Sequence, residues 1–294
     1  SSDVCSSDLF LFLIGKKSNK KLNFIEQLIL IISVYILIGF LISIPYYLSN
    51  LKVTFLSSFF EAVSGLTGTG FSTFKNIKYL DPTLILWRSS SQWIGGLFFL
   101  FFLIILFSNK SFNYKMTNLT YSGESNYKSE ENIKNNLLKI FLLYSLLSLL
   151  YFTLLNISGV RLFNSLNLTM TLVSSGGFLP SDSLNEIIIT NFQKIILIFT
   201  LIFSMLNFYF LFNIFNKRAM LKSHNEDFYL LAFAAIFILL IYFNNFEGLN
   251  IIISVLSSLS NSGITLFETD NNLSLYFLLL TIVGGSLISN TSRS

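Results

Sequence analysis

The sequence predicts an all-α membrane protein built from tandem repeats, each made of a spanning helix, a half-depth loop and a second spanning helix. Of the 294 residues, 53% are hydrophobic and only 12% are charged, whereas a soluble domain carries about 25% charged residues. The hydrophobic residues form long blocks, separated by short apolar segments that end in hydroxyl residues and glycine. This arrangement is typical of helices that cross a bilayer rather than of one large soluble core.

The two ends of the sequence do not fit this pattern. Residues 1–9, SSDVCSSDL, lack the basic and apolar regions of a signal peptide, and we interpret them as a translated sequencing adaptor. They contain Cys5, the only cysteine in the sequence, which argues against disulfides and cysteine-ligated zinc in the rest of the chain. The last apolar run stops at Ser294 without a capping element. We therefore expect both ends to be cut.

Five apolar blocks approach or exceed the length of about 20 residues that a helix needs to cross the hydrocarbon layer. Lysine and arginine concentrate in the stretches 16–21, 108–136 and 216–227, so the positive-inside rule assigns these stretches to the cytoplasm. The same lysines are mixed with acidic residues and flank the spans, which argues against a nucleic-acid partner. The five blocks are Phe24–Leu48, Leu84–Phe107, Leu137–Leu155, Ile195–Phe215 and Phe228–Phe243.

Three shorter segments lie between predicted spans, namely Val53–Phe71, Leu162–Phe178 and Asn250–Ile264. The helix-like part of each covers roughly ten to twelve residues, which is too short to cross the bilayer. A helix that enters the membrane but cannot leave it must return as a re-entrant loop. Such backbone is tolerated only where it is buried in protein or lines water. The segments therefore predict three pore loops.

The three segments end in the same pattern: a hydroxyl residue, two small or polar residues, a glycine and a bulky apolar residue. Seven positions before the apolar residue stands another hydroxyl residue, which is Ser64, Thr171 or Ser257. One small-residue cluster usually marks close helix packing, but three copies in the same place favour a repeated functional element. The strings are Thr67-Gly68-Thr69-Gly70-Phe71, Ser174-Ser175-Gly176-Gly177-Phe178 and Ser260-Asn261-Ser262-Gly263-Ile264.

These strings have the chemistry of a filter for a monovalent cation. In potassium channels, rings of backbone carbonyls replace the hydration shell of the ion. Successive carbonyls reach one axis only where some residues take a positive φ, and we expect Gly70, Gly177 and Gly263 to do so because this costs glycine little. No carboxylate lies in the strings, which argues against Ca²⁺ or Mg²⁺. The expected ligands of the ion are the backbone carbonyls of Thr67, Thr69, Ser175, Gly176, Asn261 and Ser262.

The residues from Leu86 to Gly96, LWRSSSQWIGG, closely resemble the signature that opens the second span of repeat one in the TrkH/KtrB family of potassium uptake proteins. Leu206-Asn207-Phe208 resembles the counterpart in repeat two, and Asn225-Glu226-Asp227 resembles the acidic segment before repeat three. The resemblance covers residues 22–292. It implies an intramembrane gating loop formed by Gly284, Gly285, Ser286, Ser289, Asn290, Thr291 and Ser292.

The same resemblance implies four repeats around a central ion pore, of which this chain holds three. Repeat 1 would cover residues 10–108, repeat 2 residues 137–216 and repeat 3 residues 228–294, with cytoplasmic loops at 109–136 and 217–227. It further implies potassium as the transported ion, no organic cofactor, and a homodimer in the bacterial plasma (inner) membrane. A cytosolic nucleotide-binding regulatory subunit similar to TrkA or KtrA is the implied partner. String three reads Ser-Asn-Ser-Gly where the family has Thr-Thr-Thr-Gly, but all three filter glycines are kept, which favours potassium.

Besides a potassium pore, the sequence is compatible with a sodium-permeable protein or an ion-coupled secondary transporter. A secondary transporter would have broken spans in paired halves, whereas here the glycine clusters follow extra segments between predicted spans. A membrane enzyme would need an acid–base or metal cluster at membrane depth. The sequence contains no HExxH motif, no paired intramembrane Asp and no Ser/His pairing. We therefore predict that the protein is not an enzyme.

Four polar residues stand apart from the strings. Arg88, at the start of a span, either snorkels to the interface or packs against a pore helix. Glu61, within the first short helix, either faces an outer vestibule, where it would attract cations, or is simply solvated. Asn207 either bonds across helices or lines a cavity. His224 is expected on the solvated surface.

Overall fold

The computed structural model describes residues 23–49, 53–74, 76–107, 130–206, 211, 231–236, 238–239, 248–264 and 266. Within these residues all regular secondary structure is helical, which confirms the predicted all-α class. Three helical segments are long and apolar enough to cross a membrane: Phe24–Leu48, Pro82–Leu106 and Asn135–Ile157. They coincide with the first three predicted blocks.

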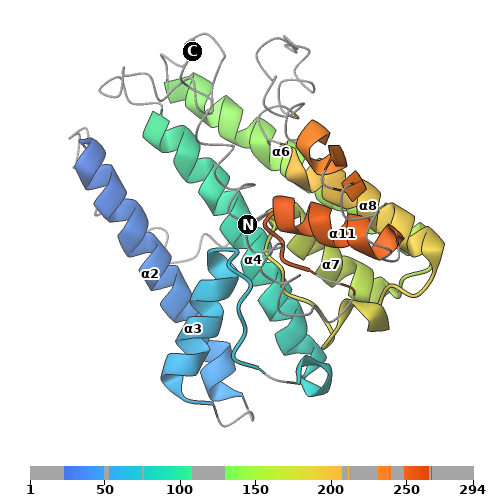
Figure 1. Cartoon of the computed structure of the whole chain (residues 1–294). Helices are drawn as coiled ribbons and strands as arrows, with labels where there is room; N and C mark the ends of the chain where they lie inside the picture. The colour runs from blue at the N-terminus through green and yellow to red at the C-terminus, as the bar shows by residue number, and fades with distance from the viewer. Residues whose placement is uncertain are drawn as a thin grey trace, which may run out of the picture.

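The three long helices are α2 (Phe24–Leu48), α4 (Pro82–Phe107) and α6 (Glu130–Ile157). In Figure 1, α2 and α4 run alongside each other, and α6 lies on the other side of α4 at a larger tilt. The start of α2, the end of α4 and the start of α6 lie at the same end of the molecule, at the top of Figure 1. This is the end at which the basic stretches predict the cytoplasm. Apolar side chains on α2, including Ile29, Ile32 and Ile36, are exposed as a lipid-facing surface requires.

Two of these helices begin at residues that cap them. Asn23 and Glu26 form a capping box at the start of α2. Asp81 accepts hydrogen bonds from the hydroxyl (2.7 Å) and the amide (3.0 Å) of Thr83 at the start of α4. These bonds lower the pKa of the Asp81 carboxyl. The cap therefore contributes fully above the ordinary carboxyl pKa and is lost as the pH falls through the lowered value.

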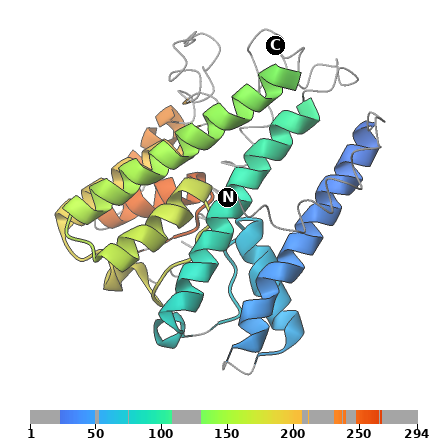
Figure 2. The ribbon, with the colours of Figure 1, turned by 180° about the vertical axis from the view of Figure 1, so that it is seen from behind.

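Three short helices occupy the positions of the predicted half-depth segments. They are α3 (Phe55–Leu66), α7 (Leu162–Ser174) and α11 (Gly248–Leu259). At 1.5 Å per residue each is about 18–20 Å long, well short of the ~30 Å hydrocarbon layer. Helix α3 packs between α2 and α4, α7 packs against α4 and α6, and α11 packs against α8 (Asn191–Met205). The view from behind in Figure 2 shows the same arrangement.

The predicted block Ile195–Phe215 is not one continuous helix. Helix α8 ends at Met205, and Leu206 has extended backbone with φ −68° and ψ 144°. The prediction of one continuous helix over this block was therefore wrong. No proline or glycine stands at the end of α8 to indicate that the helix stops there. The Ser204 hydroxyl donates to the Leu172 carbonyl of α7 (2.7 Å), which fixes the end of α8 against the short helix. Of the fifth block, residues 231–236 and 238–239 are helical and the rest lies outside the described residues.

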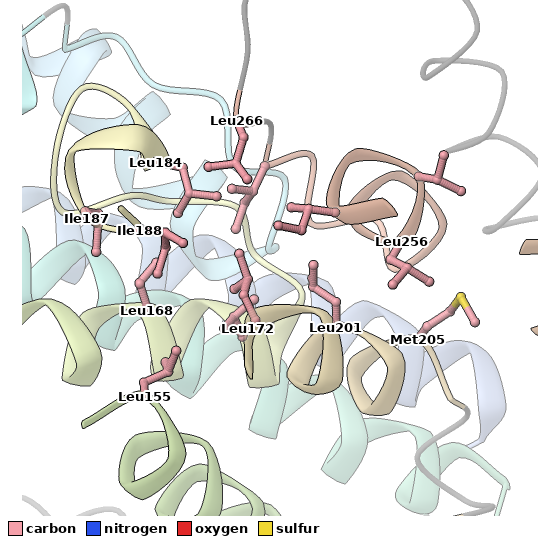
Figure 3. Close-up of a cluster of buried hydrophobic side chains, with 14 of the residues drawn as sticks. Leu155, Leu168, Leu172, Leu184, Ile187, Ile188, Leu201, Met205, Leu256 and Leu266 are labelled. Atoms are coloured by element: carbon pink, nitrogen blue, oxygen red, sulfur yellow. The ribbon is translucent and has the colours of Figure 1, made fainter. Parts of the chain in front are cut away.

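The largest apolar core lies where α7, α8 and α11 meet. Figure 3 shows its side chains converging from these helices and from the loop that follows α7. Leu168 and Leu172 of α7 and Leu201 of α8 are fully buried, and Leu256 of α11 is 3% exposed. This core holds the second and third short helices together. A smaller cluster of Ile42, Tyr46, Ala62 and Leu66 holds α3 against α2.

Candidate functional site

The three strings after the short helices share one backbone conformation. We refer to residues 67–71, 174–178 and 260–264 as glycine loops 1, 2 and 3. In each loop the fourth residue, Gly70, Gly177 or Gly263, has a positive φ of 78°, 80° or 64°, as predicted. The second residue also has a positive φ, which the sequence did not predict: 68° at Gly68, 55° at Ser175 and 59° at Asn261. Left-handed residues at every second position allow successive carbonyls to point to the same side.

Ser175 and Asn261 are the unexpected members of this pattern. The left-handed region is uncommon for any residue except glycine, although asparagine is several-fold enriched there. The residue type of Asn261 therefore weakly indicated a positive φ. For Ser175 the only indication was its alignment with Gly68 and Asn261. The repetition of the conformation in three different sequences indicates that the surrounding structure imposes it.

The hydroxyl residue seven positions before the end of each loop holds that loop closed. The carbonyls of Ser64, Thr171 and Ser257 accept hydrogen bonds from the amide of the third loop residue at 3.0, 2.9 and 3.0 Å. Their side chains bond to the backbone of the last loop residue. Ser64 donates to the Phe71 carbonyl (2.6 Å), the Thr171 hydroxyl to the Phe178 carbonyl (2.7 Å), and Ser257 Oγ accepts from the Ile264 amide (2.6 Å). The repeated hydroxyl is thus a structural staple.

The three loops meet one another. A β-carbon added to Gly70 would overlap the carbonyl oxygen of Gly176, and it would lie 3.4 Å from the Cα of Gly177. A β-carbon added to Gly177 would overlap the carbonyl oxygen of Ser262. Loop 1 therefore abuts loop 2, and loop 2 abuts loop 3. Around Gly263 no other described residue has an atom within 4 Å of the corresponding position, its two chain neighbours aside.

The loop hydroxyls are engaged in local hydrogen bonds. Thr67 donates to the Val63 carbonyl (2.8 Å) and Ser174 to the Met170 carbonyl (2.8 Å). Ser175 pairs with Ser204 at 3.1 Å. Thr69 lies 2.6 Å from the Thr67 hydroxyl, and Ser260 and Ser262 lie 2.9 Å from each other. The hydroxyls thus serve mainly to fold the loops, and backbone carbonyls remain as the oxygens that could face an ion.

One of the expected carbonyl ligands already has a partner. Gln92 of α4 donates from Nε2 to the Gly176 carbonyl, so one of the two lone pairs of that oxygen is taken. The Gln92 Oε1 accepts from the Phe178 amide (3.2 Å) and lies 3.1 Å from the Thr171 hydroxyl. A side chain of α4 therefore holds loop 2 in place. From the sequence, Gln92 was identified only as part of the stretch from Leu86 to Gly96, and its contact with loop 2 was not predicted.

Helix α4 fits between the ends of the first two short helices because it carries two glycines. A β-carbon on Gly95 would overlap the Leu66 carbonyl oxygen at the end of α3, and one on Gly96 would lie 2.9 Å from the Ser174 Cβ at the end of α7. Arg88, Gln92 and Gly95 recur at intervals of four and three residues, so they share one face of the helix. The stretch from Leu86 to Gly96 thus packs against loop 2 and the end of the helix before loop 1, and it supports both loops.

Glu61 and Arg88 form a buried ion pair, with Arg88 Nε 2.8 Å from Glu61 Oε1. Both side chains are almost fully buried, with exposures of 0% for Glu61 and 1% for Arg88. Both predictions for Glu61, a solvated acid or a vestibule acid, were therefore wrong, because the carboxylate lies between α3 and α4 with a cationic partner. For Arg88, packing against the short helix α3 is confirmed and snorkelling was wrong.

Further contacts connect the segments that follow the loops. The Asp182 carboxylate accepts from the Ile77 amide (2.6 Å), and Lys78 lies 3.6 Å from Glu186, which joins the segment after loop 1 to the segment after loop 2. Asn185 donates to the Leu266 carbonyl, which joins the segment after loop 2 to the segment after loop 3. Among the described residues no group of three or more His, Cys, Asp or Glu could hold a metal ion.

Other predicted residues lie outside the described residues. These include all seven members of the expected gating loop, Gly284, Gly285, Ser286, Ser289, Asn290, Thr291 and Ser292. Asn207, Phe208, the Asn225-Glu226-Asp227 segment and His224 also lie outside them, as do residues 1–9.

Replacing Thr171 by valine is expected to lower the free energy of unfolding by about 1–3 kcal/mol, because the buried Phe178 carbonyl loses its donor. The matched control is Thr153→Val, whose exposed hydroxyl donates to the Leu150 carbonyl of its own helix (2.9 Å). That change is expected to stay within about 0.5 kcal/mol. Unfolding in detergent measures both. Equal effects would show that the Thr171 hydroxyl contributes no more than an ordinary exposed helix hydroxyl, which would contradict the prediction.

Comparisons with known proteins place this architecture among cation transporters. The family model described as TrkH, cation transport protein, matches residues 7–275. An uncharacterized cation transporter of Methanocaldococcus jannaschii is 27% identical over 267 residues, which is 87% of this chain and 54% of that protein. The Trk system potassium uptake protein TrkG of Escherichia coli K12 is 26% identical over 175 residues, 55% of this chain and 34% of that protein.

The fold also matches a solved structure. The crystal structure of the potassium transporter TrkH from Vibrio parahaemolyticus superposes with a TM-score of 0.71 at 18% identity, covering 91% of this chain and 57% of that one. The similarity at this identity concerns the fold. The chain spans about half the length of the archaeal relative and about a third of TrkG.

Proposed function

Because this chain belongs to the TrkH family of cation transport proteins, we propose that it forms part of a pore through which potassium ions are taken up across the membrane. The observation that carries the proposal is the meeting of three glycine loops with one shared backbone conformation. Such loops, placed at the ends of short helices, allow carbonyl oxygens to replace the hydration shell of an ion. The C-terminal ends of those helices add partial negative charge.

The proposed ligands are the backbone carbonyls of Thr67, Thr69, Ser175, Asn261 and Ser262, together with the remaining lone pair of the Gly176 carbonyl. Neutral oxygens suit a weakly hydrated monovalent ion, whereas Ca²⁺ and Mg²⁺ prefer carboxylates. The nearby acid, Glu61, is neutralised by Arg88 and adds no net charge. The three filter glycines favour potassium, with a sodium-permeable or ion-coupled transporter as the alternative.

For the whole protein we propose three of four repeats in this chain, with the boundaries 10–108, 137–216 and 228–294. The segments 109–136 and 217–227 would face the cytosol, where a nucleotide-binding regulatory subunit similar to TrkA or KtrA would bind. The proposed assembly is a homodimer in the bacterial plasma membrane, gated by the loop at residues 284–292. The TrkG and TrkH relatives are potassium uptake proteins by name, which supports potassium as the transported ion.

Expression of the whole reading frame in cells that lack their own potassium uptake tests this function. We expect growth at low external potassium and uptake of rubidium, used as a potassium tracer, that excess sodium inhibits only weakly. Equal competition by sodium would favour the sodium-permeable alternative, and loss of uptake on collapse of the proton or sodium gradient at fixed voltage would favour the coupled one. Folded protein in the membrane without uptake of any alkali cation would contradict the proposal.

A further inference from the structure

The buried ion pair between Glu61 and Arg88 contacts the outer ends of two glycine loops. A buried pair of this kind is weak as a source of stability, because desolvation of the two charges offsets their attraction. The main effect of the pair therefore comes from the backbone and side-chain groups near the two loops that Glu61 and Arg88 bind.

Glu61 holds the chain that follows loop 1. Its carboxylate accepts from the Ser72 hydroxyl (2.9 Å) and from the Thr73 amide (2.8 Å), the first two residues after Phe71. The carboxylate sits on α3, whose end leads into the same loop. The two ends of loop 1 are thereby fixed to one another.

Arg88 extends these contacts to loop 2. Its Nη2 donates to the Ser72 hydroxyl (3.1 Å), and its Nη1 donates to the Leu179 carbonyl (3.4 Å), directly after loop 2. The guanidinium carbon also lies 4.2 Å from the centroid of the Phe178 ring, within the range of a cation–π contact. One planar guanidinium thus contacts the outer ends of both loops and the carboxylate between them.

We propose that Glu61 and Arg88 are positioning residues that fix the separation of glycine loops 1 and 2, and thereby set which alkali cation the site accepts. The inference rests on the proposed function. Selectivity among alkali ions depends on the spacing and number of the carbonyls that replace water, and loops 1 and 2 already touch at Gly70 and Gly176. A change in the separation of their outer ends therefore changes the spacing of the carbonyls between them.

Two variants separate positioning from charge balance. Arg88→Lys keeps a cation beside Glu61 but loses the fork that reaches Ser72 and Leu179 together. The double variant Glu61→Gln with Arg88→Gln removes both charges, so that neither is left unpaired. The matched control is Lys78→Ala, which removes the exposed ion pair between Lys78 and Glu186 that joins the same two repeats.

Two readouts are measured on the whole reading frame. The first is the ratio of rubidium to sodium uptake per folded protein. The second is the distance distribution between spin labels at Phe71→Cys and Ser183→Cys, measured by electron paramagnetic resonance. We expect Arg88→Lys and the double variant to lower the ratio by about tenfold or more, as expected for loss of charge-assisted hydrogen bonds. Both should broaden the distance distribution, whereas Lys78→Ala should change neither readout.

Two other results would contradict either the inference or the proposed function. If both variants fold and keep the wild-type ratio and distances, or if they only reduce the amount of folded protein, the pair is structural and the inference fails. If the wild type itself does not distinguish rubidium from sodium, the proposed function fails, and the distance distribution alone decides whether the pair positions the loops.

Discussion

Replacing Gly177 with alanine is expected to reduce selective cation uptake to the level of cells without the protein. Gly177 has a φ of 80°, a conformation that costs an L-residue about 1–2 kcal/mol. The added β-carbon would also overlap the carbonyl oxygen of Ser262 in loop 3, so one of the two loops must move. A carbonyl that leaves its position no longer replaces the water of the ion. Rubidium uptake per folded protein measures the effect.

Gly159→Ala is the matched control for backbone strain. Gly159 has a similar φ of 88° but lies in the connection between α6 and α7, and its nearest neighbour is the Gln193 side chain at 3.9 Å from the added carbon. This variant should lose about the same stability and keep its uptake and selectivity. If the two alanine variants transport equally well, loop 2 does not form the ion path.

Replacing Gly95 with alanine is expected to destabilise the protein by about 3 kcal/mol or more, at the upper end of the range for overpacked sites. The added β-carbon would overlap the Leu66 carbonyl oxygen and would lie 2.7 Å from the carbonyl carbon. Because these are backbone atoms at the end of α3, no side-chain rotation can relieve the contact. Since native proteins are stable by only about 5–15 kcal/mol, we expect little monodisperse protein after gel filtration.

Gly39→Ala provides the comparison within another long helix. Its β-carbon would lie 3.2 Å from Cγ2 of Val63 and 3.7 Å from the Phe59 ring, and both side chains can shift. The loss from crowding is offset in part by the better helix propensity of alanine, about 0.5–1 kcal/mol. We expect near-normal yield. Equal yields for Gly39→Ala and Gly95→Ala would mean that α4 and α3 are not packed as described.

The elements of the fold were largely predictable from the sequence, because hydrophobic length and glycine position are local signals. The block Phe24–Leu48 is the helix α2 residue for residue, and the positive φ of Gly70, Gly177 and Gly263 follows from residue type. The end of α8 at Met205 was not predictable, since its visible contact is a bond from Ser204 to the distant Leu172 carbonyl.

The contacts around the candidate site were harder to predict from the sequence, because they join residues on different helices. Glu61 and Arg88 are 27 positions apart and meet only after α3 and α4 pack together. One signal was present: Arg88, Gln92 and Gly95 form a polar and small-residue stripe on one face of a long span. A stripe of that kind indicates a buried face, but a single sequence does not tell which groups it meets.

The bond between Gln92 and the Gly176 carbonyl has a consequence for how the protein is made. The ribosome synthesises α4 before loop 2, so Gln92 is already part of the chain when this loop emerges. Loop 1, by contrast, must wait for Arg88 and Gly95 of the helix that follows it. Loop 2 therefore depends on a helix that precedes its own short helix, and loop 1 on a helix that follows it. A chimaera that takes its second repeat from a relative should assemble only if it also inherits the matching face of the preceding helix.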